Sequence, residues 1–204
     1  MDHGIIVKSK YKEVFSMFIK DVNEDISLRM LSIRDAEALF QITDQSREHL
    51  RQWLPWVDET KTVEDSRSFI KNSFQLYADG TGLTTGIFYQ EVLVGVAGFN
   101  KYDWKNRIGY IGYWLASAYQ GHGIMTKTVH TLVDYAFHEL ELNRIDIRAA
   151  KENKRSRSIP ERLGFTEEGV IRQGEWLYDH YVDHVIYGML KREWAKVEHP
   201  PTGK

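Results

Sequence analysis

The sequence contains no cysteine, and this absence excludes disulfide bonds, cysteine-based zinc sites and thiol nucleophiles. It also has little excess charge, because the formal net charge is −2 at pH 7. No broad basic field is therefore available for direct binding of nucleic acid or an anionic membrane. No window approaches the roughly 18 unbroken apolar residues of a membrane span, and the N-terminus lacks the hydrophobic region of a signal peptide. We expect a cytoplasmic protein that acts on a small molecule or on another protein.

The remaining composition is that of a packed globular protein. Of the 204 residues, 42% are hydrophobic and 27% are charged, which suits one domain with a sizeable core. We expect this domain to occupy residues 17–195. Residues 1–16 fit its pattern poorly, so we interpret them as an extension that is either native or added for expression. Residues 196–204 include Pro200 and Pro201 and are expected to form a loose tail.

Hydrophobic patterns predict a mixed order of helices and strands. Strands are predicted over residues 26–31, 84–89, 92–99, 107–115, 145–149, 170–176 and 181–190. Helices are predicted over residues 32–43, 47–53, 63–78, 125–140 and 153–163. Pro160 lies inside the last helix and removes a hydrogen bond to the Ser156 carbonyl, so we expect a kink there. The order indicates an α+β fold with a mixed sheet rather than the regular alternation of a doubly wound fold.

The stretch "YQGHGIMT" (residues 119–126) places Gly121 and Gly123 between the end of a predicted strand and the start of a predicted helix. The first N–H groups of a helix have no partner within it and carry partial positive charge. Glycines in front of them let the backbone curl closely around a phosphate. A tight structural turn uses the same residue types, so the spacing leaves both interpretations open. The sequence has neither a Walker A motif nor the third glycine of the dinucleotide fingerprint, which excludes those two phosphate loops.

Residues 120–125 ("QGHGIM") resemble the Gln/Arg-x-x-Gly-x-Gly/Ala signature of the GNAT N-acetyltransferase superfamily. Met125 stands at the last position, where the superfamily usually has Gly or Ala. The resemblance covers roughly residues 17–195 and includes the segments "DISLRML", "IGYWLASAYQGHG" and "NKRSRSIPERLGF". Two further segments, "HLRQWLPWVDE" and "DHYVDHVIYGMLKREW", resemble one branch of the superfamily, the ribosomal-protein-alanine N-acetyltransferases.

This resemblance implies a single-domain fold in which helices flank a mixed, mostly antiparallel central sheet with one splayed pair of strands. In the superfamily, the strand before the loop bulges and separates from the next strand, and the pantetheine of acetyl-CoA lies in the gap. That role falls here on the main chain around Leu115. Gly109 and Gly112 in the same strand suit such a bulge, or alternatively a close packing contact.

The resemblance also implies that acetyl-CoA is the cosubstrate and that the loop holds its pyrophosphate. The N–H groups from His122 to Thr126 would be the donors, and the Thr126 hydroxyl would add to them. Asn153 would contact the cofactor and Ser156 would lie near its thiol, although Asn153 is equally typical of a helix N-cap. The expected cofactor-binding residues are Leu115, Gln120, Gly121, His122, Gly123, Ile124, Met125, Thr126, Asn153 and Ser156.

Acetyl transfer from a thioester to an amine needs a base for the ammonium nucleophile and a proton donor for the departing thiolate. The resemblance assigns these catalytic roles to Glu175 and Ser156. Glu175 would otherwise be an exposed strand carboxylate. The expected acceptor is a primary amine, with the α-amino group of a ribosomal protein as the leading candidate. A polyamine, an aminoglycoside-like amine and a non-catalytic acyl-CoA-binding module are the alternatives, and a homodimer is the expected assembly.

Two smaller groups of residues have more than one interpretation. His180 and His184 share one face of a strand-like run, but no nearby set of ligands supports a metal, so no metal site is expected. Trp53, Pro55 and Trp56 suit either a substrate cleft or a place in the core or an interface, and the core or an interface is the favoured interpretation.

Overall fold

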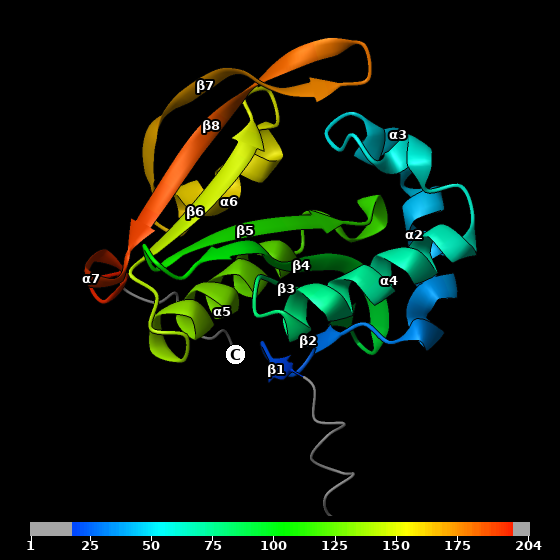
Figure 1. Ribbon diagram of the computed structural model, residues 1–204, viewed down its shortest axis with the longest axis horizontal. Coiled ribbons are helices and arrows are strands. Elements are labelled where there is room, and N and C mark those ends of the chain that lie inside the picture. Colours follow the sequence, from blue (N-terminus) through cyan, green and yellow to red (C-terminus); the bar gives the residue numbers. More distant parts are fainter. Residues whose placement is uncertain (1–17, 198–204) are drawn as a thin grey trace, which may run out of the picture.

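The computed structural model describes residues 18–197, so the expected extension at residues 1–16 and most of the expected tail lie outside the described residues. The chain forms an eight-stranded sheet in the order β1-β2-β3-β4-β5-β6-β8-β7 (Figure 1). The strands are β1 Ile19–Asp21, β2 Ile26–Met30, β3 Leu83–Tyr89, β4 Val92–Asp103, β5 Ile108–Leu115, β6 Arg144–Ala150, β7 Thr166–Leu177 and β8 His180–Leu190. Within residues 18–197, β5 and β6 pair in parallel and every other neighbouring pair is antiparallel. The expected mixed, mostly antiparallel sheet is therefore confirmed.

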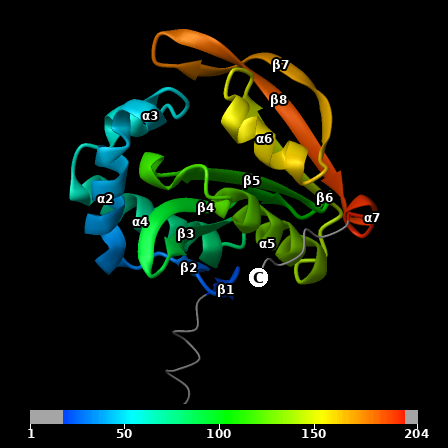
Figure 2. The same ribbon diagram turned by 180° about the vertical axis from the view of Figure 1, so that it is seen from behind.

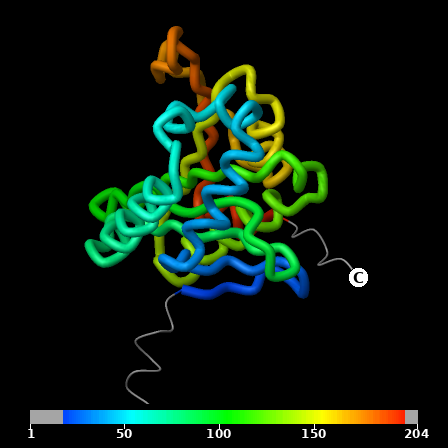
Figure 3. The backbone as a smooth tube through the Cα atoms, turned by 90° about the vertical axis from the view of Figure 1, so that its right-hand side faces the viewer, coloured from blue at the N-terminus to red at the C-terminus, as the bar shows by residue number. Residues whose placement is uncertain are grey.

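Helices cover both faces of this sheet. They are α2 Ala36–Gln45, α3 Arg47–Arg51, α4 Val63–Ala78, α5 Ile124–His138, α6 Lys154–Arg162 and α7 Lys191–Trp194, with short 3₁₀ turns at Ile33–Asp35, Val57–Glu59 and Ser117–Tyr119. The α4 helix lies in front of the sheet in Figure 1, whereas α5 and α6 lie in front of it when the molecule is seen from behind in Figure 2. Seen from the side in Figure 3, the α2–α4 group and α6 lie on opposite sides of the strands.

The α5 helix shows how the apolar pattern builds the larger core. Its apolar residues recur every three or four positions, and Val129, Leu132, Val133, Ala136 and Phe137 are fully buried. Burying one large side chain of this kind contributes roughly 1.5–3 kcal/mol to folding. A second cluster of buried apolar side chains lies between α2, α4 and the opposite face of the sheet. The sheet is thus held between two apolar layers.

The strands β5 and β6 separate partway along their length, as the resemblance predicts. Their parallel pairing covers four residue pairs and ends at Ile111 and Ile147. Beyond this point β5 stays on β4 as far as Leu115, which pairs with Gly95. The β6 strand instead continues beside β8 as far as Ala150. One edge of β5 is therefore free of β6 from Gly112 onward.

The expected bulge in β5 is wrong, because the extra residue lies in the neighbouring strand. Phe99 pairs with Ile111 and Lys101 pairs with Tyr110, which leaves Asn100 of β4 unpaired between them. The glycine of β5 at this point has a packing role instead: a Cβ on Gly112 would lie 2.4 Å from Asn100 Nδ2. Close packing is therefore the correct interpretation here.

Two other parts of the chain differ from the sequence-based expectation. The β1 strand was not predicted, because only three residues form it and a charged stretch follows. Phe18 beside it packs edge-to-face on Tyr135, with ring centroids 4.9 Å apart. The β7 strand begins at Thr166 rather than at residue 170, and its first residues are exposed on both faces, so no alternation of apolar residues marks them.

We predict that alanine at two glycines of the sheet has unequal effects on stability. A Cβ on Gly98 would lie 1.9 Å from the Leu83 carbonyl oxygen, which is backbone, whereas a Cβ on Gly112 would meet the movable Asn100 side chain. Gly98→Ala should therefore cost about 3 kcal/mol or more and Gly112→Ala about 1 kcal/mol. Urea unfolding of both variants measures the difference. Equal costs would show that the Asn100 side chain cannot move aside.

Candidate active site

Two clefts meet where β5 and β6 separate. The first, here called the loop cleft, has a volume of about 710 Å³ and lies between the Gln120–Thr126 loop, the end of β5 and α6. The second, here called the sheet cleft, has a volume of about 830 Å³ and lies between α4 and the open face of β5 and β6. Both clefts are lined by the same six residues at their junction: Trp53, Leu54, Tyr113, Trp114, Asn153 and Ser156. A ligand in one cleft can thus reach a ligand in the other.

The glycines of the loop have a conformation that other residues rarely adopt. Gly121 has a φ of 86° and Gly123 has a φ of 72°, and a Cβ on either would meet no atom within 4 Å. The space beside them is open, so the glycines are not explained by crowding. No side chain caps the start of α5, and Gly123 and Thr126 line the loop cleft. These features fit a backbone that receives a phosphate.

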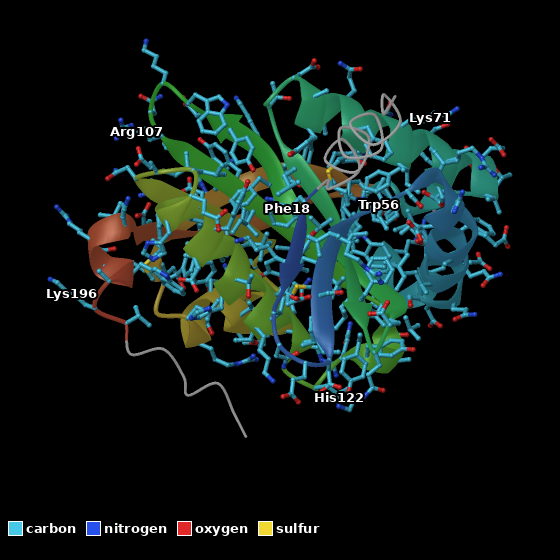
Figure 4. The ribbon with its side chains drawn as sticks, turned by 90° about the horizontal axis from the view of Figure 1, so that it is seen from below. Phe18, Trp56, Lys71, Arg107, His122 and Lys196 are labelled. Atoms are coloured by element: carbon cyan, nitrogen blue, oxygen red, sulfur yellow. The ribbon has the colours of Figure 1, made fainter. Side chains whose placement is uncertain are left out.

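The other residues of the loop divide between the cleft and the core. Ile124 and Met125 are buried, at 2% and 7% exposure. The backbone of Met125 is therefore the part that a ligand in the loop cleft can use. His122 is exposed, does not line either cleft, and lies at the rim of the molecule in Figure 4. For His122 the backbone N–H is the remaining candidate contact.

Two arginines of α6 that the sequence analysis missed also line the loop cleft. Arg162 Nη1 donates a hydrogen bond to Thr126 Oγ1 at 2.8 Å, and Arg155 Nη1 donates one to Gln120 Oε1 at 2.7 Å. They stand seven residues apart, which places them on one face of a helix, and this spacing could have revealed them. Guanidinium groups suit the binding of phosphate oxygens.

The side chain of Gln120 is already held on both sides. Its amide Nε2 donates to His49 Nε2 at 2.6 Å, while its oxygen accepts the hydrogen bond from Arg155. Burial, and secondarily the charge of Arg155, lowers the pKa of His49, which favours the neutral imidazole that can accept this bond. Gln120 therefore connects α3 to α6 across the loop cleft.

Asn153 and Ser156 lie together at the start of α6. Asn153 is the N-cap residue, and its Oδ1 accepts a hydrogen bond from the Ser156 N–H at 3.1 Å. The N-cap interpretation of Asn153 is thus confirmed, and both residues also line both clefts. The Ser156 hydroxyl lies 3.4 Å from the Tyr113 hydroxyl.

Tyr113 donates a hydrogen bond to the backbone carbonyl that lacks a helical donor because of Pro160. Pro160 has no N–H, and the carbonyl of Ser156, four residues earlier, accepts a hydrogen bond from the Tyr113 hydroxyl at 3.0 Å. Burial raises the pKa of Tyr113 far above its ordinary value, so its hydroxyl keeps the proton. The structure assigns one continuous helix to Lys154–Arg162 with Pro160 inside it. The hydrogen bond from Tyr113 thereby joins β5 to α6 across the gap between β5 and β6.

Glu175 lines the sheet cleft beside His184, whose Nε2 lies 3.3 Å from Glu175 Oε2. A bulge in β7 precedes Glu175, because Arg172–Gly174 face only one residue of β8, Asp183. Gln173 within it has a φ of 53°, and its N–H donates to Asp183 Oδ1 at 2.9 Å. Bulges commonly redirect side chains near functional sites.

The two tryptophans of the α3 region belong to the cleft walls rather than to the core, so the core interpretation was wrong. Trp53 lines both clefts and Trp56 lines the sheet cleft, and both are half-buried. Pro55 between them lines neither cleft. The Tyr178 hydroxyl at the β7–β8 turn donates to the Leu54 carbonyl at 2.7 Å. Figure 1 shows this turn reaching towards α3 over the open end of the sheet.

Within residues 18–197, no group of three or more His, Asp or Glu side chains is arranged to hold a metal ion. His180 instead pairs with Asp179 at 2.7 Å. None of the helices in this part of the chain is long and apolar enough to cross a bilayer.

Comparison with known proteins identifies the family. Residues 25–166 match the family described as "Acetyltransferase (GNAT) domain". The chain is 40% identical over 179 residues to YdaF of Bacillus subtilis (strain 168), provisionally named a ribosomal N-acetyltransferase, and the match covers 87% of this chain and 98% of the relative. It is 30% identical over 169 residues to the ribosomal-protein-serine acetyltransferase of Escherichia coli (strain K12), covering 83% of this chain and 94% of the relative.

A solved structure agrees with this assignment. RimL, the ribosomal L7/L12 α-N-protein acetyltransferase in complex with coenzyme A, has a TM-score of 0.82 and 29% identity, covering 85% of this chain and 98% of that chain. The chain therefore belongs to the GNAT family of acetyl-CoA-dependent N-acetyltransferases.

We predict that Gly123→Asp abolishes the thermal stabilisation given by coenzyme A. The ligand stabilises the native state by about 2.7 kcal/mol at a hundredfold excess over its dissociation constant. Aspartate would place a negative charge where a phosphate approaches. Gly123→Asn is the matched control, because asparagine has the same size, tolerates the positive φ and carries no charge. Melting curves with and without coenzyme A measure the effect, and a full stabilisation of the aspartate variant would exclude the loop from the site.

We predict that Tyr113 and Pro160 are energetically coupled. Tyr113→Phe leaves the partly buried Ser156 carbonyl without this donor and should lower the free energy of unfolding by about 1–3 kcal/mol. In a Pro160→Ala background the new N–H can bond that carbonyl, so Tyr113→Phe should cost about 1 kcal/mol less there. Urea unfolding of the four proteins completes the cycle. The same cost in both backgrounds would mean that this hydrogen bond does not hold β5 to α6.

Proposed function

We propose that this protein transfers the acetyl group of acetyl-CoA to the α-amino group of a ribosomal protein. The observation that carries the proposal is the meeting of the two clefts at Ser156, with Glu175 on the wall of the sheet cleft. The loop cleft would hold acetyl-CoA and the sheet cleft would receive the amine. The names of the two curated relatives, which concern ribosomal acetylation, support this choice of acceptor.

The loop cleft provides groups of the right chemistry for the cosubstrate, which supplies an activated acetyl thioester when it is bound. The backbone from Gly121 to Thr126 would receive the pyrophosphate, and Arg155 and Arg162 would add positive charge for phosphate oxygens. The edge of β5 that β6 leaves free, near Leu115, offers main-chain hydrogen bonds to an extended ligand. Apart from His122, each of these assignments uses a residue that lines the cleft.

Glu175 and Ser156 would handle the protons of the reaction. An α-amino group reaches the site mainly as an ammonium ion and must lose one proton before its nitrogen can attack. Glu175 would accept that proton from the sheet cleft. The Ser156 hydroxyl, at the junction of the clefts, would hold a proton for the departing sulfur. Tyr113 keeps Ser156 in position through its carbonyl.

The homodimer and the cytoplasmic location stay predictions. We propose the β7–β8 hairpin as the contact between copies, because β7 is the last strand of the sheet and apolar side chains on the hairpin are exposed. Val170, Trp176 and Tyr181 have exposures of 44%, 53% and 57%. A long exposed edge strand is a surface that proteins commonly cover. Sedimentation at several concentrations tests the assembly.

The proposed acceptor is tested by incubating the protein with labelled acetyl-CoA and three kinds of amine: ribosomal proteins, polyamines and aminoglycosides. Mass spectrometry then locates the label. Because the sequence has no cysteine, the coenzyme A released can also be measured by a thiol reagent without background from the enzyme. Label on the N-terminus of a ribosomal protein supports the proposal. Label on small amines only would overturn the acceptor, and binding of acetyl-CoA without release of thiol would indicate a non-catalytic module.

We predict that Glu175→Gln lowers turnover on the true acceptor by about 10²–10⁴-fold and leaves acetyl-CoA affinity nearly unchanged. The amide keeps the shape of the side chain but cannot accept the proton, and the defect should shrink as pH rises because more of the amine is already neutral. Glu167→Gln, on the same strand but outside both clefts, is the control. Ser156→Ala should have a milder effect, since a thiolate is a tolerable leaving group. Steady-state kinetics measure all three, and near-normal turnover of Glu175→Gln would place the base elsewhere.

A further inference from the structure

His184 is a titratable side chain beside Glu175 in the sheet cleft, and neither the loop nor the family signature involves it. Its Nε2 lies 3.3 Å from Oε2 of Glu175, and the two side chains are 19% and 29% exposed. Both line the cleft proposed for the amine. We propose that His184 is a positioning residue for the reaction, which acts through Glu175 by taking up the proton that the carboxylate receives from the acceptor. This inference rests on the proposed role of Glu175.

The chemistry of the acceptor gives the reason for a second group. An α-ammonium group ordinarily loses its proton near pH 7.7–8.0, a glutamic acid near about 4.3 and an imidazolium near about 6.5. Proton transfer from the ammonium to a carboxylate is therefore unfavourable by roughly 3.5 pKa units. The overall transfer from the ammonium to an imidazole is unfavourable by only roughly 1.3 pKa units. A partner of this kind makes the accepted proton less prone to return to the amine.

The proton transfer can be followed bond by bond. One N–H bond of the acceptor ammonium breaks and an O–H bond forms on the Glu175 carboxyl. That O–H bond then breaks as an N–H bond forms at Nε2 of His184, which leaves a carboxylate beside an imidazolium. The imidazolium returns its proton to water, because the ring is partly exposed. The second proton of the ammonium leaves with the sulfur, so the charges balance.

The backbone holds the pair in place from both sides. His184 lies on β8, where it pairs with Ala150 of β6 and with Ile171 of β7. Glu175 follows the bulge that Asp183 stabilises through the Gln173 N–H. Side chains on paired strands keep a geometry more closely than side chains on loops.

Four other charged side chains line this cleft. They are Asp146 and Arg148 on β6 and Glu59 and Asp65 on the helical wall. Arg144 donates to Asp146, whose pKa burial raises. Asp65 accepts hydrogen bonds from Thr62 at the start of α4. Arg148 lies 5.8 Å from the ring centroid of Tyr110. Among the described residues, Glu175 is therefore the carboxylate that pairs with His184.

The first test compares the pH dependence of wild type and His184→Gln with the ribosomal acceptor identified by mass spectrometry. The ratio of their kcat/KM values cancels the ionisation of the amine. The ratio should be about tenfold larger at pH 7.5 than at pH 5.5, because a neutral imidazole can accept a proton and an imidazolium cannot. His180→Gln is the matched control, since His180 lies on the same strand at the exposed turn beside Asp179. Its ratio should stay constant.

The second test reads the pair directly, by NMR titration of the histidine rings in the full-length protein. The sequence has eight histidines, and the resonance missing from His184→Gln identifies the one of interest. Its titration midpoint should fall in Glu175→Gln, because the negative charge 3.3 Å away is lost. This readout does not depend on turnover.

The outcomes separate the inference from the function on which it rests. A constant kcat/KM ratio across pH 5.5–7.5, or an unchanged titration midpoint in Glu175→Gln, overturns the role of His184 even if Glu175 proves essential. Near-normal turnover of Glu175→Gln would show that Glu175 is not the base, and it would overturn the role of His184 as well. A pH-dependent ratio together with a shifted midpoint supports the inference, because a purely structural histidine would change neither in this way.

Discussion

The separation of β5 from β6 is the constraint on which the rest of the site depends. Each strand has a better-matched neighbour on its other side: β4 holds β5 to its end, and β8 holds β6 to its end. The parallel pairing between them therefore covers only four residue pairs. Both clefts meet where it stops, so an activated group approached from one face of the sheet can be reached by a nucleophile from the other.

A hydrogen bond that α6 lacks because of Pro160 is replaced by one that joins the two sides of this opening. Pro160 costs α6 one backbone hydrogen bond, and the Ser156 carbonyl that loses it accepts the Tyr113 hydroxyl of β5. The sequence alone predicts the missing bond, since proline has no N–H. It does not predict the new donor, which lies 43 residues earlier in the chain. The proline is thus consistent with a structural requirement of the site, and the kink expected at it stays a prediction.

The sequence predicts features that depend on neighbouring residues, and it does not predict features that depend on contacts between distant residues. Periodicity and turn residues predict most helices and strands, because an amphipathic pattern depends only on residues that are close together in the sequence. The glycines predict the loop. The bulge at Asn100, the arginines over the loop and the contact of His184 with Glu175 were not predicted. Each depends on which side chains of distant elements meet, and periodicity says nothing about that. The exposed start of β7 was missed because no buried face marks it.

The contact between Tyr178 and Leu54 can form only late in the synthesis of the chain. These residues are 124 positions apart, and Glu175 and His184 belong to the same last hairpin. Chains emerge from the ribosome with the N-terminal part first. A nascent chain can therefore form the loop at residues 119–126 and start α5 long before the strands that carry the proton acceptor are made. The wall of the sheet cleft is completed only when translation is nearly finished, so a chain that ends before β7 would contain the loop at residues 119–126 and Ser156 but would lack Glu175 and His184.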